Sequence, residues 1–373
     1  MFASIFAAIG PAGLTALFLL LAALAVAIFF YRRSRNTVFH SVHRGKAHAG
    51  GCKFDSAEVN RTRFAKTPDI DLSNLPAPDP RIVKAFATIK EAALLAKVNM
   101  LSGEADMTVG GKTVRITSRS TFGPGHLTAM AWLEEFYASI GLPTRRESYR
   151  KNGKTFYYLI ATRKGDTNPE KVVIAGAHLD STAGNQFSAE PVAPGADDDG
   201  SGTIALTELA RILKDLPLAC TVEFVHFTGE EQGLWASYAY SDKVAAAKVN
   251  VVAMVEMDMI GYCAKPGNRL DIHDDTDAES HSLVVLMVRN IKRYGLNLNP
   301  VDTHNHAVQD RSDHAGFLDH GYKAILVSEE FTDDGFNPRY HSADERSKYM
   351  NFPYMAEVTR ALLATIADLA ELK

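Results

Sequence analysis

Residues 171–180 read KVVIAGAHLD, a run of aliphatic residues that ends in a histidine and an aspartate. A short, continuous apolar run is typical of a strand buried on both faces in a parallel sheet. Packing alone does not require an imidazole and a carboxylate at the end of such a strand. Because residues i and i+2 of a strand point to the same face, Asp180 is placed to lie behind His178 and orient its ring.

Strand and helix patterns alternate on both sides of this run. Apolar runs predict further strands at residues 155–163, 220–228, 251–262 and 323–330. Apolar periodicity predicts helices at residues 81–98, 125–142, 201–216, 233–244, 277–296 and 353–373. This alternation predicts an α/β domain with a mostly parallel mixed sheet, flanked by helices on both faces.

The N-terminal segment has a different composition. Residues 2–31 carry no charged side chain, and roughly 20 apolar residues are enough for a helix to cross a bilayer. The nearest arginines, at positions 32, 33 and 35, follow the apolar run, which favours a retained anchor over a cleaved signal peptide. We therefore expect a single-pass anchor in the lipid bilayer at residues 1–35, a juxtamembrane linker at 36–80 and one folded domain at 81–373.

Charge and cysteine content exclude several classes of protein. The formal net charge is −4 over 373 residues, which gives no reason to expect nucleic acid as a partner. The three cysteines, Cys52, Cys220 and Cys263, have no CxxC spacing. This argues against a disulfide framework and against a thiolate metal site.

Acids and histidines also follow the other predicted strands. GADDDGSG at residues 195–202 leads into a helix, FTGEEQG and MDMIG each follow a strand, and RYHSADE precedes the last helix. In open α/β sheets, functional groups gather at the carboxyl ends of the strands. Each motif alone has an ordinary structural explanation, such as helix capping. Four such coincidences in one fold are not expected.

The residue types indicate a particular chemistry. Two divalent ions about 3.5–4 Å apart need a bridging carboxylate and further nitrogen or oxygen ligands on each side. Imidazole and carboxylate ligands without thiolate suit Zn²⁺ in a hydrolytic site. Asp198 is expected to bridge the ions, and Glu230, beside a ligand, is left as the candidate general base. The full set of predicted metal ligands is His178, Asp198, Glu231, Asp258 and His341.

The motifs AHLDS, GADDDGSG, GEEQGL, MDMIG and YHSADE, in this order, resemble those of the two-zinc aminopeptidase family of metallo-exopeptidases. Glutamate carboxypeptidase and glutaminyl cyclase are relatives of that family. The resemblance covers roughly residues 120–373 and implies the zinc aminopeptidase fold, two Zn²⁺ ions per chain, peptide substrates and the same five ligands. The domain at 81–373 would then be a single metallopeptidase domain.

The resemblance also implies roles for residues outside the ligand set. Asp180 would support the first histidine, Glu230 would be the general base, and Tyr340 would stabilise the tetrahedral intermediate. Asp313, in the motif RSDHAGF, would lie near the site with a structural or substrate-shaping role.

Three features depart from the family pattern. The strand at 155–162 contains YYLIA where many relatives have Asn-Val-Ile-Ala, residues 1–80 have no counterpart in the simplest secreted members, and a cysteine pair near the last histidine is missing. A one-zinc transferase resembling glutaminyl cyclase, a carboxypeptidase or dipeptidase of the same fold, and a non-catalytic tethered interaction domain remain as alternatives. The charges after the anchor favour a cytoplasmic domain, whereas the resemblance favours an exported one, so the side of the membrane stays open. Specificity, physiological substrate and oligomeric state also stay open.

Overall fold

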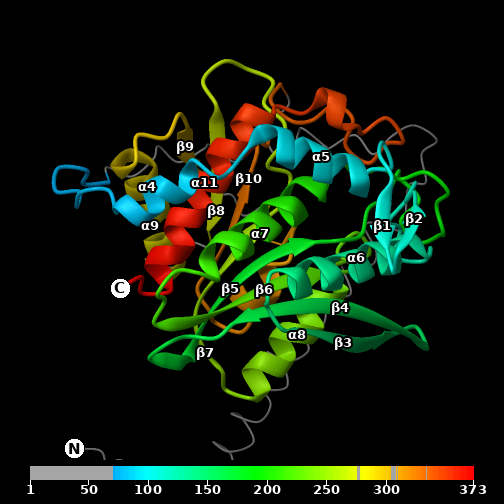
Figure 1. Cartoon of the computed structure of the whole chain (residues 1–373), viewed down its shortest axis with the longest axis horizontal. Helices are drawn as coiled ribbons and strands as arrows, with labels where there is room; N and C mark the ends of the chain where they lie inside the picture. The colour runs from blue at the N-terminus through cyan, green and yellow to red at the C-terminus, as the bar shows by residue number, and fades with distance from the viewer. Residues whose placement is uncertain (1–69, 275–277, 304–307, 309, 333) are drawn as a thin grey trace, which may run out of the picture. The chain divides into compact units, whose positions relative to one another are not determined.

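The computed structural model describes residues 70–274, 278–303, 308, 310–332 and 334–373 (Figure 1). The predicted anchor at 1–35 and the linker as far as residue 69 lie outside the described residues. In the part of the chain that is described, no helix combines the length and the apolar character that a membrane crossing requires.

A mixed sheet of eight described strands forms the centre of the fold (Figure 1). Its strands lie in the order β3-β4-β6-β5-β7-β10-β8-β9. The inner strands β6, β5, β7 and β10 run parallel to one another. On one side of them β4 is antiparallel to β6, and β3 is antiparallel to β4. On the other side β8 is antiparallel to β10 and parallel to β9. The strand bounds are β3 Thr144–Lys151, β4 Lys154–Arg163, β5 Asn168–His178, β6 Cys220–Phe227, β7 Asn250–Met257, β8 Arg269–Asp274, β9 Asn299–Asp302 and β10 Ala324–Ser328. A separate hairpin joins β1 (Met107–Val109) to β2 (Lys112–Val114).

Alternate residues of the central strands enter two different cores. In β5, Val173 and Ala175 belong to the larger core, whereas Val172 and Ile174 belong to the smaller one. Successive side chains of a strand point to opposite faces, so a strand covered on both sides needs a continuous apolar run. This is why KVVIAGAHLD predicts an inner strand.

Helices cover both faces of the sheet. The larger core is closed by α4 Pro80–Phe86, α5 Glu91–Leu101, α6 Gly125–Ser139, α7 Gly200–Leu213, α9 Ala278–Arg293 and α11 Phe352–Leu369, and the smaller core by α8 Trp235–Ala246 and α10 Ala315–Leu318. A short 3₁₀ turn, η1, spans Ser347–Tyr349. The sheet with helices on both faces agrees with the sequence-based prediction.

The predicted helix at 81–98 is divided in the structure. The α4 helix ends at Phe86, and the hydroxyl of Thr88 donates a hydrogen bond to the carbonyl of Ala85 at 2.7 Å. Such side-chain bonds compete with the helical ladder. Ile89 is buried in the core, and the chain restarts as α5 at Glu91. The prediction of one continuous helix was therefore wrong.

The parallel strands bring the motifs to one edge of the sheet. His178 is the last residue of β5 and pairs in register with Phe227, the last residue of β6. Asp258 directly follows β7, and Asp199 caps the N-terminus of α7. The motifs from separate parts of the sequence thus meet at the same edge.

Candidate metal centre

The carboxylate of Asp198 lies between the two predicted histidine ligands. One oxygen, Oδ1, lies 2.9 Å from Nε2 of His178, and the other, Oδ2, lies 3.2 Å from Nε2 of His341. Nε2 of His341 is also 2.8 Å from Oε2 of Glu231, and Nε2 of His178 is 3.5 Å from Oδ1 of Asp258. The structure therefore brings all five predicted ligands together, with Asp198 in the central position.

The three consecutive aspartates have separate positions. Asp197 accepts hydrogen bonds from the backbone N–H of Gly261 at 2.8 Å and from Nδ2 of Asn337 at 3.0 Å. Asp199 accepts from the backbone N–H of Gly202 at 2.7 Å, as the N-cap of α7, and from that of His178 at 3.1 Å. Only the middle carboxylate of the run faces both histidines.

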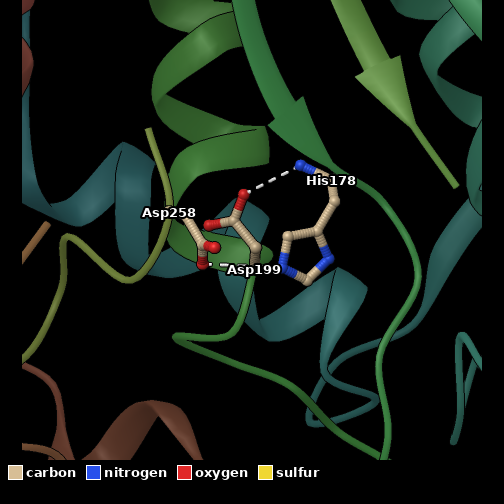
Figure 2. A group of neighbouring side chains, drawn as sticks. All are labelled: His178, Asp199 and Asp258. Carbon is tan, nitrogen blue, oxygen red and sulfur yellow. Dashed lines mark hydrogen bonds and ion pairs between the residues drawn. The ribbon is translucent and has the colours of Figure 1, made fainter. Parts of the chain in front are cut away.

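Figure 2 shows the relation between the end of β5 and the residue after β7. The carboxylate of Asp199 contacts the main-chain nitrogen of His178, while the imidazole of His178 faces the carboxylate of Asp258. His178, Asp199 and Asp258 offer ligand atoms that all lie within 4.8 Å of one another, as do those of His178, Asp198 and Glu231.

Unsatisfied polar atoms indicate what this arrangement is suited to hold. Among the described residues, buried atoms without a hydrogen-bond partner include Nε2 of His178, Oε1 of Glu231 and Oδ1 of Asp258. Nε2 of His178 lies 2.9 Å from Oδ1 of Asp198 as an ion-pair contact. Buried polar atoms without partners are costly unless an ion or water satisfies them. Imidazole and carboxylate groups that face a shared space therefore fit divalent cations, and their chemistry suits Zn²⁺.

The electrostatics of the metal-free chain point the same way. Burial alone would lower the pKa of His178, but the negative charges of Asp258 and Asp198 outweigh it and raise that pKa well above its usual value. For His341, Glu231 and Asp198 likewise overcome the effect of burial and raise the pKa. The site therefore attracts positive charge. Without metal it holds protons on the imidazoles, and a bound cation would displace them.

Asp180 lies behind His178, but its main chain makes the closer contact. Nδ1 of His178 is 3.1 Å from the carbonyl oxygen of Asp180 and 3.8 Å from Oδ1 of its carboxylate. The carboxylate instead accepts from the hydroxyl of Thr121 at 2.7 Å and from the backbone N–H of Glu230 at 3.4 Å. Asp180 thus connects the first histidine to the loop that carries Glu230 and Glu231.

The adjacent glutamates differ in their surroundings. The side chain of Glu231 is 2% exposed and contacts His341, whereas Glu230 lines a small pocket together with Asp198, Asp258 and Tyr340. Burial raises the pKa of Glu231 to about 7 and the pKa of Glu230 well above its usual value. Glu231 therefore faces His341, and Glu230 faces the pocket.

Tyr340 also belongs to this pocket. Its ring stacks on the imidazole of His341 with centroids 3.6 Å apart, and burial raises the pKa of its hydroxyl well above 10. His341 has φ 53°, a left-handed backbone conformation that few residues with a side chain adopt. Met259 and Phe331 form part of the apolar wall of the pocket.

Arg119 has a part in the site that the sequence did not predict. This fully buried guanidinium donates to four backbone carbonyls: Nε to Leu179 at 2.8 Å, Nη1 to Leu101 at 2.9 Å and Pro194 at 2.7 Å, and Nη2 to Gly195 at 2.8 Å. It therefore fixes the end of β5 against the start of the aspartate run. No motif surrounds Arg119 in the sequence, so only the structure reveals this contact.

Comparison with known protein families assigns the chain to one of them. Residues 159–366, more than half of the chain, match the sequence pattern of peptidase family M28. The chain therefore belongs to peptidase family M28.

Curated relatives carry related names. Over 225 residues the chain is 33% identical to "Leucine aminopeptidase 1" of Fusarium vanettenii. This alignment covers 57% of this chain and 54% of that protein. It is also 36% identical over 116 residues to "Probable zinc metalloprotease" of Pyrenophora tritici-repentis, covering 31% of this chain and 27% of that protein. The chain spans about half the length of the leucine aminopeptidases it matches.

Solved structures share the fold. The Legionella pneumophila LapA aminopeptidase superposes with a TM-score of 0.65 at 20% identity, covering 83% of this chain and 79% of that one. The glutaminyl cyclase of Fimbriiglobus ruber gives a TM-score of 0.60 at 19% identity, covering 75% of this chain and 95% of that one. At these identities the likeness establishes the fold alone.

Proposed function

We propose that this protein is a zinc-dependent exopeptidase, most specifically an aminopeptidase that removes N-terminal residues from peptides by means of two Zn²⁺ ions. The observation that carries the proposal is the position of Asp198, with one carboxylate oxygen 2.9 Å from His178 and the other 3.2 Å from His341. A carboxylate between two imidazole-containing ligand sets is the arrangement that a two-metal hydrolytic site requires.

These distances, with those of His178 to Asp258 and His341 to Glu231, support a division of the ligands between two ions. His178 and Asp258 would hold one ion, Glu231 and His341 the other, and Asp198 would contribute one oxygen to each. Bound Zn²⁺ lowers the pKa of a coordinated water from 15.7 toward roughly 7, which makes hydroxide accessible near neutral pH.

The remaining groups of the pocket would move protons and position the substrate. Glu230 would accept a proton from the attacking water and return it to the leaving amine, as a general base and then a general acid. Burial raises the pKa of Glu230 in the metal-free chain, and bound cations would oppose that shift and favour the carboxylate that a base requires. Tyr340 would keep its hydroxyl proton, because burial raises its pKa, and would donate a hydrogen bond to the developing oxyanion.

Parallel peptide assays test the proposal. The purified full chain should hydrolyse a peptide that begins with a free leucine, the residue named by two curated relatives, and leave its N-acetylated form intact. Cleavage of the N-acetylated peptide from its C-terminus would instead indicate a carboxypeptidase. Release of ammonia and a cyclised product from a Gln-initiated peptide, with one zinc per chain, would indicate a cyclase. The complete ligand set around Asp198 favours hydrolysis.

We also propose that residues 1–35 attach the enzyme to a lipid bilayer as a single span. Support comes from the sequence alone, in which residues 2–31 carry no charged side chain. Expression of the full chain followed by carbonate extraction should leave it in the membrane pellet. Protease protection of residues 81–373 in sealed vesicles would then identify the side of the membrane on which the domain lies.

A further inference from the structure

Glu345 makes an unusual set of contacts with the chain that leads to Asp198. Its carboxylate oxygen Oε1 accepts hydrogen bonds from the backbone N–H groups of Asp197 at 3.0 Å and Asp198 at 2.7 Å. Its own backbone carbonyl accepts from Ala196 at 3.3 Å. The backbone N–H groups of three consecutive residues, Ala196, Asp197 and Asp198, therefore donate to one residue. The last of the three, Asp198, carries the central carboxylate of the site.

The same residue belongs to the turn that follows His341. The backbone N–H of Glu345 donates to the carbonyl of Ser342 at 3.2 Å, and Glu345 is 1% exposed. Since the imidazole of His341 contacts the carboxylate of Asp198, these residues close a ring of contacts. The side chain of Asp198 contacts His341, and the main chain of Asp198 is held by the turn that carries His341.

This ring determines where the central carboxylate can lie. The backbone of Asp198 cannot shift without breaking its 2.7 Å bond to Glu345, and the turn cannot shift without moving His341. Groups that orient metal ligands from behind are commonly worth 10–100-fold in metal affinity or activity. Glu345 lies behind two ligands at once.

We propose that Glu345 is a positioning residue that fixes Asp198 and His341 relative to each other, and so sets the affinity of the ion they share. It acts by geometry: its oxygen must reach two backbone N–H groups from inside the turn after His341. The inference rests on the proposed function in that the bound ion is Zn²⁺, but not on which peptide bond is cleaved.

Three substitutions separate geometry from charge. Glu345→Gln keeps an acceptor oxygen at the same reach and should bind both zinc ions within about fivefold of the wild-type affinity, since its amide oxygen still accepts from both N–H groups although each bond loses its charge assistance. Glu345→Ala removes the acceptor, and the more weakly bound zinc should lose roughly 10–100-fold in affinity. Glu345→Asp keeps the charge but shortens the side chain, so it should lose affinity in the same direction as Glu345→Ala.

Zinc affinity is measured on the purified full chain by competition with a chromophoric chelator, and melting of the metal-free protein is recorded in parallel. Glu208→Ala is the matched control. Glu208 is a buried carboxylate of α7 that pairs with Lys97 and Arg211, so its loss should lower the melting temperature and leave zinc affinity unchanged.

Each outcome bears on the proposal. Equal loss of zinc affinity in Glu345→Gln and Glu345→Ala would overturn it, because charge rather than position would then matter. Unchanged affinity in Glu345→Ala, or an equal loss in Glu208→Ala, would also overturn it. If Glu345→Ala does not fold, the contrast between Glu345→Gln and Glu345→Asp decides. A wild-type chain that binds no zinc would instead refute the proposed function itself.

Discussion

Replacing Glu230 with glutamine should separate catalysis from metal binding. In the described part of the chain, Glu230 forms hydrogen bonds through its main chain and none through its side chain. Its N–H donates to Asp180, and its carbonyl accepts from the turn that follows. Glutamine has the same shape, so the substitution should leave the fold intact. It removes the group that takes a proton in the pocket.

The expected loss follows from that role. Removal of a general base typically costs about 10²–10⁴ in rate, which corresponds to roughly 2.7–5.4 kcal/mol of transition-state stabilisation at 1.36 kcal/mol per tenfold. Because Glu231 rather than Glu230 contacts His341, at 2.8 Å, both zinc ions should remain bound in Glu230→Gln. The loss should appear in kcat, with zinc content unchanged.

Steady-state hydrolysis of a Leu-initiated peptide and zinc emission spectrometry on the same preparation provide the assay. Glu231→Gln is the comparison variant and should lose zinc. The reasoning is refuted if Glu230→Gln releases an ion while Glu231→Gln keeps both, since the ligand and the base would then be exchanged. It is equally refuted if Glu230→Gln retains wild-type turnover.

Three further results are expected. Asp198→Asn should release at least one zinc, because an amide nitrogen cannot replace the carboxylate oxygen on one side, and retention of both ions on emission spectrometry would count against a bridging role. Asp180→Ala should lower zinc affinity about 10–100-fold in a chelator titration, since it removes the carboxylate that lies 3.8 Å from Nδ1 of His178 and accepts from the backbone N–H of Glu230, and an unchanged titration would exclude that role. The pKa values of buried Glu231 and Asp313 are raised to about 7, above their unfolded values of 4.5 and 3.8, so their ionisation costs stability as pH rises. The melting temperature of the metal-free protein should therefore fall between about pH 4 and pH 7 while the stabilisation by added zinc grows, and a rising melting temperature would contradict these shifts.

The inner part of the fold was predictable because burial on both faces leaves a strong signal. The run KVVIAGAHLD and the other apolar runs correspond to β4, β5, β6, β7 and β10. The edge strand Thr144–Lys151 was missed, because TRRESYRK is mostly charged and has little apolar pattern. The strands Arg269–Asp274 and Asn299–Asp302 were also missed, as each is short and mixes polar with apolar residues.

The candidate site was predictable to the extent that its residues stand in motifs. His178, Asp198 and His341 come from different stretches, yet each follows a predicted strand or precedes a predicted helix, and the structure brings them together. The groups that hold those stretches in place left weaker signals. Arg119 acts entirely through backbone carbonyls, and Glu345 through backbone N–H groups, so neither requires a recognisable pattern of neighbouring residues.

The number of zinc ions bound per chain tests the central claim most directly, because the claim is that one carboxylate, Asp198, serves two ions. Emission spectrometry on the purified full chain, after equilibration with zinc and removal of loosely bound metal, should give two ions per chain. A value of one would contradict the two-metal account and favour chemistry of the cyclase type.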